Sequence, residues 1–215
     1  MIKRAFDIVT AFTTLVLLIP LMLIVAMLIK FDSEGPIFFR QQRIGRGFRP
    51  FWIYKFRTMR KAPIADGAEV TIGNDPRVTR VGRFLRKTKI DELPQLINIL
   101  RGEMSFVGPR PEVPRYVRLF EREYQEILTV RPGLTDLASL KYRDEAALLA
   151  KAEDPEQEYT MRVLPDKINL SKDYIRHSSF LFDLGLILRT ILAVLVFRVS
   201  SSDGSSCCRL RRLHD

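Results

Sequence analysis

The sequence predicts a mostly helical α+β protein whose N-terminal segment enters a membrane. Three observations predict this fold class: an uncharged apolar segment near the N-terminus, two strand-like segments joined by a glycine turn, and several amphipathic helical segments after them. We expect a re-entrant membrane helix hairpin, a small β-hairpin and amphipathic interfacial helices, the architecture of a monotopic membrane protein. The expected organisation is a membrane anchor over residues 1–31, a cytoplasmic or interfacial domain over 32–199 and a disordered tail over 200–215.

The membrane segment comprises residues 8–29, which are 22 residues without a charge. A straight helix of this length is about 33 Å long, which matches a hydrocarbon core of about 30 Å. A buried core helix is the alternative, but so long an uncharged segment exceeds what a small core normally encloses. No small-residue cleavage site follows, so the pattern does not indicate a secretory signal peptide.

The charges around this segment bear on whether it crosses the membrane. Lys3 and Arg4 precede it and Lys30 follows it, so both ends have the basic character of cytoplasmic flanks. Pro20, near the middle, removes one backbone hydrogen bond and kinks a helix. Both facts favour a hairpin that enters and leaves the same leaflet. A spanning helix that contains a lone proline is the alternative.

The predicted β-hairpin consists of residues 37–43 and 51–59, separated by a turn that contains two glycines. Alternation in the second strand places Trp52, Tyr54 and Phe56 on one face. We interpret these aromatic side chains as core packing.

Helical segments are expected in the remainder of the chain. The expected ranges are residues 80–87, a helix from 88 or 91 to 101, residues 112–129, a solvated acidic face over 144–158, and residues 180–199. Thr88 and Asp91 have the spacing of a capping box for the second of these helices. Residues 106–111, rich in Gly and Pro, are expected to form a loop. The last helix is apolar but contains three charges, which favours an interfacial or packed helix over a spanning one.

The net charge of +10 is concentrated in two clusters of basic residues. Residues 38–61 contain eight basic and no acidic side chains, and residues 77–89 contain six basic side chains. Asp91 and Glu92 follow directly. An acidic pair that complements a helix dipole is the simple interpretation. Beside so many cations, however, the pair also has the composition of a phosphate-handling site, because Mg²⁺ binds one or two carboxylates plus phosphate oxygens and a carboxylate can attack phosphorus.

Several classes of protein are excluded by composition. Cys207 and Cys208 are adjacent, so they form neither a disulfide framework nor a spaced zinc site. The sequence contains no nucleotide-binding phosphate loop of the Walker type. The two histidines, His177 and His214, have no identifiable acid–base partner, and His177 is expected to be a surface residue.

Four motifs, taken in order, resemble the bacterial sugar transferase family, the monotopic polyprenyl-phosphate phosphoglycosyl transferases. Together with the apolar N-terminus they cover about residues 1–195. They are Tyr54-Lys55-Phe56-Arg57-Thr58-Met59, Asp91-Glu92-Leu93-Pro94-Gln95-Leu96, Met104-Ser105-Phe106-Val107-Gly108-Pro109-Arg110-Pro111 and Arg131-Pro132-Gly133.

This resemblance implies an enzyme that transfers a phospho-sugar from a UDP-sugar to polyprenyl (undecaprenyl) phosphate and releases UMP. The reaction would be the first membrane step in the assembly of an exopolysaccharide, another glycan or a glycoconjugate. The catalytic domain would lie on the cytoplasmic face of the bacterial inner membrane, with inner-leaflet lipids as partners and no nucleic acid. The oligomeric state stays open, with a homodimer as one option.

The resemblance also implies roles for individual residues. Asp91 would be the nucleophile, forming a covalent aspartyl phospho-sugar intermediate, with Mg²⁺ bound at or beside it. Glu92 would assist the second half-reaction by positioning or deprotonating the polyprenyl phosphate. The family's substrate-binding residues map onto Lys55, Arg86, Pro109, Arg110 and Arg143.

The chain departs from the family pattern at two places. Ile19 precedes Pro20 where family members often have serine, so any hydrogen bond from that serine is lost. Residues 136–139 read Asp-Leu-Ala-Ser where many members read Gly-Leu-Ala-Gln, in a region that bears on the choice of sugar or nucleotide.

Two other functions stay open from the residues alone. One is a non-enzymatic, membrane-anchored basic module that binds anionic lipid or nucleic acid, for which salt-sensitive binding without turnover would be expected. It gives the Asp91–Glu92 pair no role. The other is a membrane-bound phosphatase, which would use the same groups with an activated water as acceptor.

Overall fold

The computed structural model describes residues 2–60 and 75–200, with side chains described to residue 194. One long helix, α1 (Ile2–Asp32), precedes a hairpin of strands β1 (Phe38–Ile44) and β2 (Pro50–Phe56). A second, parallel sheet pairs β3 (Ser105–Val107) with β4 (Gly133–Thr135). The later α-helices are α2 (Arg80–Thr88), α3 (Leu96–Arg101), α4 (Pro114–Leu119), α5 (Glu121–Ile127), α6 (Leu137–Lys141), α7 (Glu145–Leu149), α8 (Pro155–Glu158), α9 (Leu164–His177) and α10 (Phe180–Ser200).

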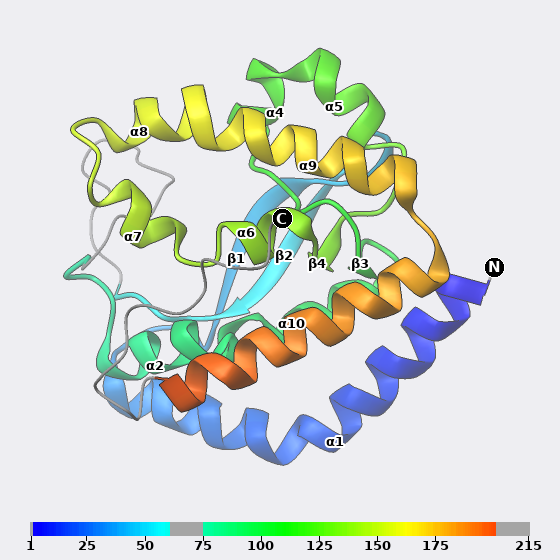
Figure 1. Ribbon diagram of the computed structural model, residues 1–215. Helices are drawn as coiled ribbons and strands as arrows, with labels where there is room; N and C mark the ends of the chain where they lie inside the picture. The colour runs from blue at the N-terminus through cyan, green and yellow to red at the C-terminus, as the bar shows by residue number, and fades with distance from the viewer. Residues whose placement is uncertain (1, 61–74, 201–215) are drawn as a thin grey trace.

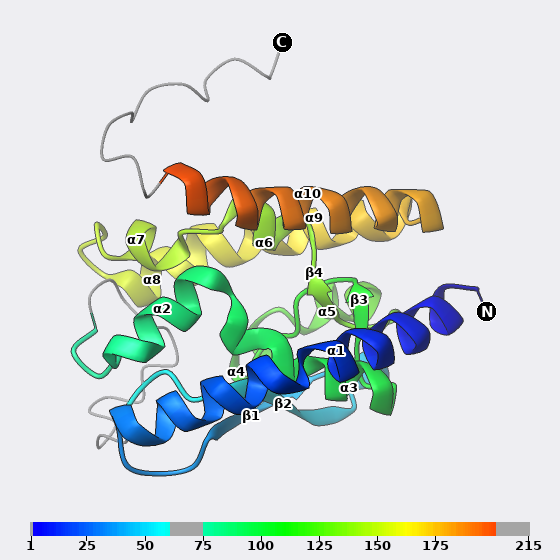
Figure 2. The same ribbon diagram turned by 90° about the horizontal axis from the view of Figure 1, so that it is seen from below.

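The two small sheets lie between helical layers. Figure 1 shows α1 along one edge of the molecule and α9 along the opposite edge, with α4 and α5 beside α9 and the strands between. Helix α10 crosses the face between these edges, and Figure 2 shows it on the opposite side of the molecule from the hairpin. The predicted mostly helical fold with a small antiparallel hairpin is therefore confirmed.

Helix α1 is continuous through Pro20, and Figure 1 shows that it changes direction near its middle. Within the described ranges it is the one helix long and apolar enough to cross a membrane, and only 11% of its most apolar stretch is buried. Most of its apolar side chains are therefore not accounted for by packing within the chain. This outcome agrees with a membrane segment and not with a buried core helix.

The N-terminal end of α1 is bound to the domain by polar contacts. Lys3 Nζ lies 2.6 Å from Oδ2 of Asp183 in α10. Asp7, which is buried, accepts hydrogen bonds from the Ser105 hydroxyl at 2.8 Å and from the backbone N–H of Phe106 at 3.2 Å. These contacts fix the first two turns of α1 against β3.

The C-terminal end of α1 is bound to the same domain. The Arg57 guanidinium, at the end of β2, donates to the Ser33 carbonyl at 2.6 Å and to the Ile29 carbonyl at 3.4 Å. Asp32 accepts a hydrogen bond from the backbone N–H of Val81 in α2 at 3.1 Å. Both ends of α1 therefore contact one folded unit.

The hairpin forms as predicted, but its buried face is the other one. Phe51 and Ile53 are buried against α3 and α1, whereas the Trp52 side chain is 53% exposed. The two-stranded sheet is packed on one face only, so the alternate residues point outward. The expectation that Trp52, Tyr54 and Phe56 form a core face is thus wrong for Trp52. Phe56 is buried because the end of the strand reaches the contact between α1 and α2.

The segment around Asp91 does not begin as the predicted capped helix. Lys89 adopts a left-handed conformation (φ 58°) and ends α2, and a 3-10 helix over Ile90–Gln95 precedes α3. The Thr88 hydroxyl donates back to the Phe84 carbonyl, so the capping box does not form. Pro94 has no N–H for an α-helical hydrogen bond, which is consistent with the tighter turn. Asp91 and Glu92 consequently lie in a buried turn between two helices.

The parallel β3–β4 pair is absent from the sequence-based expectations, which treat 106–111 as a loop and 131–133 as a helix breaker. Residues 112–129 form two helices, broken at Phe120, while the helices expected at 80–87 and 180–199 are confirmed. Helices α7 and α8 occupy the acidic region. The tail is predicted over 200–215; Ser200 ends α10, and residues 201–215 lie outside the described residues.

Glycines make the β3–β4 pairing possible. A Cβ on Gly133 would lie 2.1 Å from the backbone nitrogen of Gly108, closer than any real contact allows. We expect Gly133→Ala to lower the free energy of unfolding by about 1–3 kcal/mol, because the backbones must separate. Thermal unfolding in detergent micelles measures this change.

Gly185→Ala in α10 is the matched control. A Cβ there meets nothing within 4 Å, so this substitution should be neutral or stabilising. Equal melting temperatures for Gly133→Ala and the wild type would contradict the close approach seen at β3–β4.

Candidate active site

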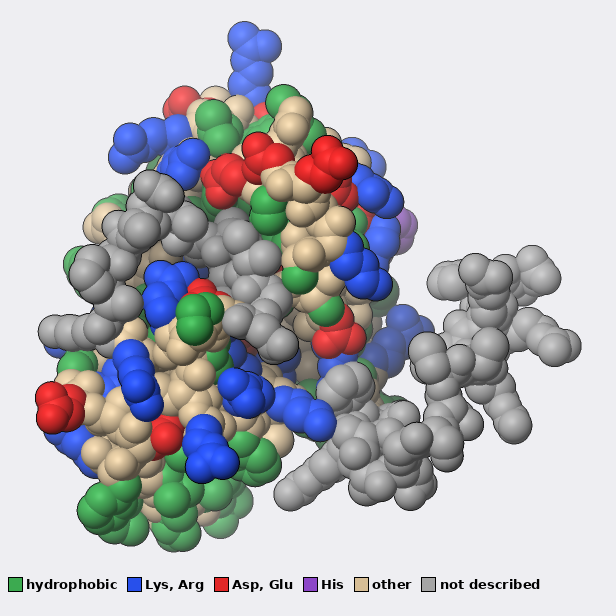
Figure 3. All heavy atoms as spheres, turned by 90° about the vertical axis from the view of Figure 1, so that its left-hand side faces the viewer, with side chains coloured by type: hydrophobic (Ala, Val, Ile, Leu, Met, Phe, Trp, Pro, Cys, Tyr) green, Lys and Arg blue, Asp and Glu red, His purple; other side chains and the backbone are tan. Residues whose placement is uncertain are grey.

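An open groove of about 2160 Å³ lies where the hairpin, the Ile90–Gln95 turn and the segment after β3 meet. Its lining includes most of the side chains predicted to act on substrate, namely Lys55, Arg86, Asp91, Glu92, Arg110 and Arg143. Figure 3 shows Lys and Arg side chains gathered next to the apolar edge of the molecule, which in Figure 1 is the edge that α1 occupies. The groove itself is basic, because Lys55, Arg86 and Arg110 are among the side chains that line it.

Glu92 is the polar centre of the groove. Its Oε1 atom lies 2.9 Å from Lys55 Nζ and 2.6 Å from an Arg110 guanidinium nitrogen, Nη2. Burial alone would raise the pKa of Glu92, but the charges of Arg110 and Lys55 hold this pKa well below its usual range. Glu92 is therefore an ionised carboxylate that fixes two cations, one from β2 and one from the segment after β3.

Asp91 lies in a different environment although it is the adjacent residue. It is buried, and its Oδ1 atom has no hydrogen-bond partner. Burial raises the pKa of Asp91 and the negative charge of Glu92 adds to this effect, while Lys55, Lys89 and Arg86 oppose it. An incompletely satisfied carboxylate oxygen surrounded by cations is suited to bind a cation or to react with an electrophile.

The two cations that bind Glu92 are held by different elements. Strand β2 supplies Lys55, whose pKa is lowered by burial. The backbone N–H of Arg110 donates to Asp136 Oδ2 at 3.0 Å, and Asp136 also caps α6 by accepting from the Ser139 N–H. Asp136 thus positions the segment that carries Arg110. In the sequence, Asp136 is notable only as part of a departure from the family pattern; an Asp directly before a helix is the signal that would have indicated a cap.

Three further predicted residues have distinct positions. Arg86 donates from Nε to the Thr58 hydroxyl at 2.8 Å and lines the groove. Arg143 also lines the groove and hydrogen-bonds to the Ala193 carbonyl of α10. Pro109 does not line the groove; its carbonyl accepts from the Gly133 N–H at 2.9 Å, which supports the turn before Arg110.

The groups available for Mg²⁺ are few. Among residues 2–60 and 75–200, no cluster of three or more His, Cys, Asp or Glu side chains is suited to hold a metal ion. A lone carboxylate oxygen without a partner, Asp91 Oδ1, fits a Mg²⁺ ion that takes the rest of its ligands from phosphate and water. The site fits a metal that arrives with its phosphorylated ligand rather than a permanently caged ion.

The structure thus combines a long, mostly exposed apolar helix with a groove in which basic side chains surround two buried carboxylates. Comparison with known proteins then gives the family. The model of the family described as bacterial sugar transferase matches residues 1–197. The chain belongs to the bacterial sugar transferase family, as its motifs predict, and the predicted class of enzyme, a phosphoglycosyl transferase, is confirmed at the level of the family.

Individual relatives carry more specific names. A UDP-glucose:undecaprenyl-phosphate glucose-1-phosphate transferase of Caulobacter vibrioides is 42% identical over 90% of this chain and 69% of its own length. The exopolysaccharide production protein PSS of Rhizobium leguminosarum bv. phaseoli is 39% identical over 90% of this chain and 95% of its own. A UDP-N-acetylgalactosamine-undecaprenyl-phosphate N-acetylgalactosaminephosphotransferase of Aeromonas hydrophila is 40% identical, and the chain spans 44% of its length.

The two adjacent carboxylates should respond to neutralisation in opposite ways. At pH 7 without ligand, we expect Asp91→Asn to raise the melting temperature, because it removes a poorly compensated buried charge. Glu92→Gln should lower it, because two cations lose their counter-ion. The Asp91→Asn shift should be about 2–4 °C, which corresponds to about 1 kcal/mol in a chain of this size. The Glu92→Gln shift should be larger, because removing one partner of a buried ion pair costs about 3–5 kcal/mol. Thermal unfolding in detergent measures both.

The stabilisation that Glu92 provides should also depend on pH. Because the folded-state pKa of Glu92 is lowered from its ordinary value of 4.5, its stabilisation is complete above that value and is lost as the pH falls below it. The difference between the wild type and Glu92→Gln should therefore shrink in acid. A difference that grows below pH 4.5 would be inconsistent with this ion pair.

Proposed function

We propose that this protein transfers a phospho-sugar from a UDP-sugar to undecaprenyl phosphate and releases UMP, as the first membrane step of exopolysaccharide or glycoconjugate assembly. The observation that carries this proposal is the position of Asp91, a buried carboxylate with one unpartnered oxygen, next to Glu92, a carboxylate that holds two cations. The names of relatives support the substrate class. A non-enzymatic basic module would give this buried pair no role.

In the first half-reaction, an Asp91 carboxylate oxygen attacks the β-phosphorus of the UDP-sugar. The new bond is an acyl phosphate, and the bond from the β-phosphorus to the oxygen that bridges the two phosphates breaks, so that UMP leaves with that oxygen. Lys55 and Arg110 neutralise charge on the phosphate oxygens.

In the second half-reaction, a phosphate oxygen of undecaprenyl phosphate attacks the phosphorus of the intermediate. The acyl phosphate bond breaks, Asp91 is regenerated, and the product is an undecaprenyl diphospho-sugar. Glu92 is ionised and already bonded to two cations, which makes it a weak base. Of its two expected roles, we therefore assign positioning of the polyprenyl phosphate, through the two cations that Glu92 holds, rather than deprotonation of the lipid.

Asp91 would hold Mg²⁺, which when bound would offset the negative charge of the diphosphate. The relatives named above differ in their sugars, N-acetylgalactosamine in one and glucose in another. The donor sugar therefore has to be identified by assaying a panel of UDP-sugars, because the relatives do not agree on one sugar.

The two bound ends of α1 support the re-entrant topology. A spanning helix separates its ends by the thickness of the bilayer, whereas Lys3 and Asp7 at one end and Asp32 at the other contact the same domain. We therefore assign both ends to the cytoplasmic face of the bacterial inner membrane, with α1 bent into one leaflet near Pro20.

The activity is tested with purified protein, Mg²⁺, undecaprenyl phosphate and a panel of UDP-sugars. We expect release of UMP and a lipid-linked sugar with at least one donor. Release of free sugar phosphate with no lipid product would instead support the phosphatase. Salt-sensitive lipid binding without any product would support the basic module.

Variants of the carboxylate pair separate their roles. Asp91→Asn should abolish turnover and form no phospho-sugar adduct when incubated with donor alone, as measured by intact-protein mass spectrometry. Glu92→Gln should still form the adduct while its turnover falls about 100-fold, because the cations are misplaced. An adduct on Asp91→Asn would exclude Asp91 as the nucleophile.

The topology is tested by labelling single cysteines. Ile2 is 74% exposed and Phe31 is 88% exposed, so Ile2→Cys and Phe31→Cys report the two ends of α1 in a background with Cys207 and Cys208 replaced by serine. An impermeant maleimide should label both in inverted membrane vesicles and neither in intact cells. Labelling on opposite sides would mean that α1 spans the membrane.

A further inference from the structure

The groove that contains Asp91 continues as an apolar corridor between α1 and α10. We define the corridor by Thr10 and Thr14 of α1, Phe106 of β3, and Ile187, Ile191 and Val194 of α10, all of which line the groove. Thr10 and Thr14 are four residues apart and share one face of α1. Ile187, Ile191 and Val194 have the i, i+4, i+7 spacing of one face of α10. The two helices thus present continuous walls.

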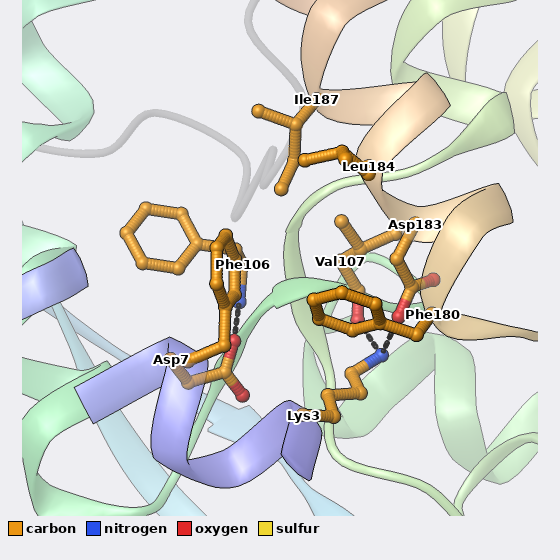
Figure 4. Close-up of a pocket in the computed structure, with 9 residues that line it drawn as sticks. Lys3, Asp7, Phe106, Val107, Phe180, Asp183, Leu184 and Ile187 are labelled. Atoms are coloured by element: carbon orange, nitrogen blue, oxygen red, sulfur yellow. Dashed lines mark hydrogen bonds and ion pairs between the residues drawn. The ribbon is translucent and has the colours of Figure 1, made fainter. Parts of the chain in front are cut away.

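The corridor is closed at one end. Lys3 and Asp183 form an ion pair between the N-terminal ends of α1 and α10, and the rings of Phe6 and Phe180 meet edge to face at 5.5 Å. Figure 4 shows these side chains with Phe106 around a cavity of only about 10 Å³, which has room for about one water molecule. A larger ligand therefore cannot enter past this junction.

The corridor is open in the other direction. Figure 2 shows that α1 and α10 are closest at their N-terminal ends and separate towards their C-terminal ends. The same groove is lined by the cations and carboxylates around Glu92, and α1, which forms one wall of the corridor, is mostly exposed along its apolar length. One groove therefore combines an apolar wall with a phosphate-binding end.

We propose that this corridor binds the isoprenoid chain of the acceptor lipid and delivers its phosphate to Asp91. The inference rests on the proposed function and adds a binding subsite to it. A UDP-sugar has no hydrocarbon portion that would match the Ile187–Ile191 wall. A long hydrocarbon chain with a terminal phosphate matches both ends of the groove. Because the opening adjoins the exposed face of α1, the chain can move in laterally from the bilayer.

Two adjacent residues of α10 provide the test and its matched control. Ile191 and Leu192 are 49% and 58% exposed, but only Ile191 lines the groove. Ile191→Trp narrows the corridor, so we expect the KM for undecaprenyl phosphate to rise about tenfold. The KM for the UDP-sugar and the acceptor-free burst of UMP should not change. Leu192→Trp should behave like the wild type in every measurement.

Two kinetic results would contradict the proposed lipid-binding subsite. Equal KM values for the lipid in both tryptophan variants would exclude chain binding at this wall. A reduced UMP burst in Ile191→Trp alone would mean that the position acts on the donor instead. If the wild type releases no UMP with any UDP-sugar, the proposed function itself fails, whatever these variants show.

Photo-crosslinking tests occupancy independently of turnover. With p-benzoylphenylalanine in place of Ile191, irradiation in micelles of undecaprenyl phosphate and phospholipid should give an adduct with the mass of the polyprenyl lipid. The same probe in place of Leu192 should give little of this adduct. A phospholipid adduct only, at position 191, would mean that bilayer acyl chains fill the corridor, and would overturn the proposal.

Discussion

The arrangement of the site depends on one electrostatic constraint: Glu92 is buried as an ion and therefore needs its cations. Lys55 comes from β2 and Arg110 from the segment after β3, so one carboxylate oxygen joins two parts of the chain that are far apart in sequence. Burying an ion without a partner would cost several kcal/mol. The hairpin, the Ile90–Gln95 turn and the second sheet are all positioned so that this pairing is satisfied.

The same constraint explains why neighbouring carboxylates differ. Glu92 forms ion pairs with Lys55 and Arg110, whereas Asp91 has one buried oxygen without a partner, and burial raises the pKa of Asp91. The two adjacent carboxylates therefore differ in their chemistry because their surroundings differ. Glu92 stabilises the groove by holding two cations. Asp91 has an oxygen without a hydrogen-bond partner, to which a ligand can bind.

Features that depend on local pattern were predictable from the sequence, and those that depend on distant partners were not. Length and lack of charge predict α1, and alternation predicts the hairpin. Clustered cations predict the surroundings of Asp91 and Glu92. In contrast, the exposed position of Trp52 follows from which face α3 covers, and the β3–β4 pair follows from a contact between Gly108 and Gly133. The capping box at Thr88 failed because Lys89 ends the helix in a left-handed conformation. The catalytic, substrate-binding and metal-binding roles of the site residues remain predictions.

Arg57 connects the anchor to the site, because it binds the end of α1 and lies two residues after Lys55 in the chain. Ala11, Val25 and Ile29 of α1 are fully or almost fully enclosed by the domain, and Asp7 satisfies groups of β3. Deleting α1 would therefore open two hydrophobic clusters, remove the Ile29 carbonyl from Arg57 and leave the Ser105 hydroxyl without its Asp7 partner. A truncated chain is not a water-soluble version of this enzyme. Any preparation has to keep the anchor and supply an amphiphile to cover it.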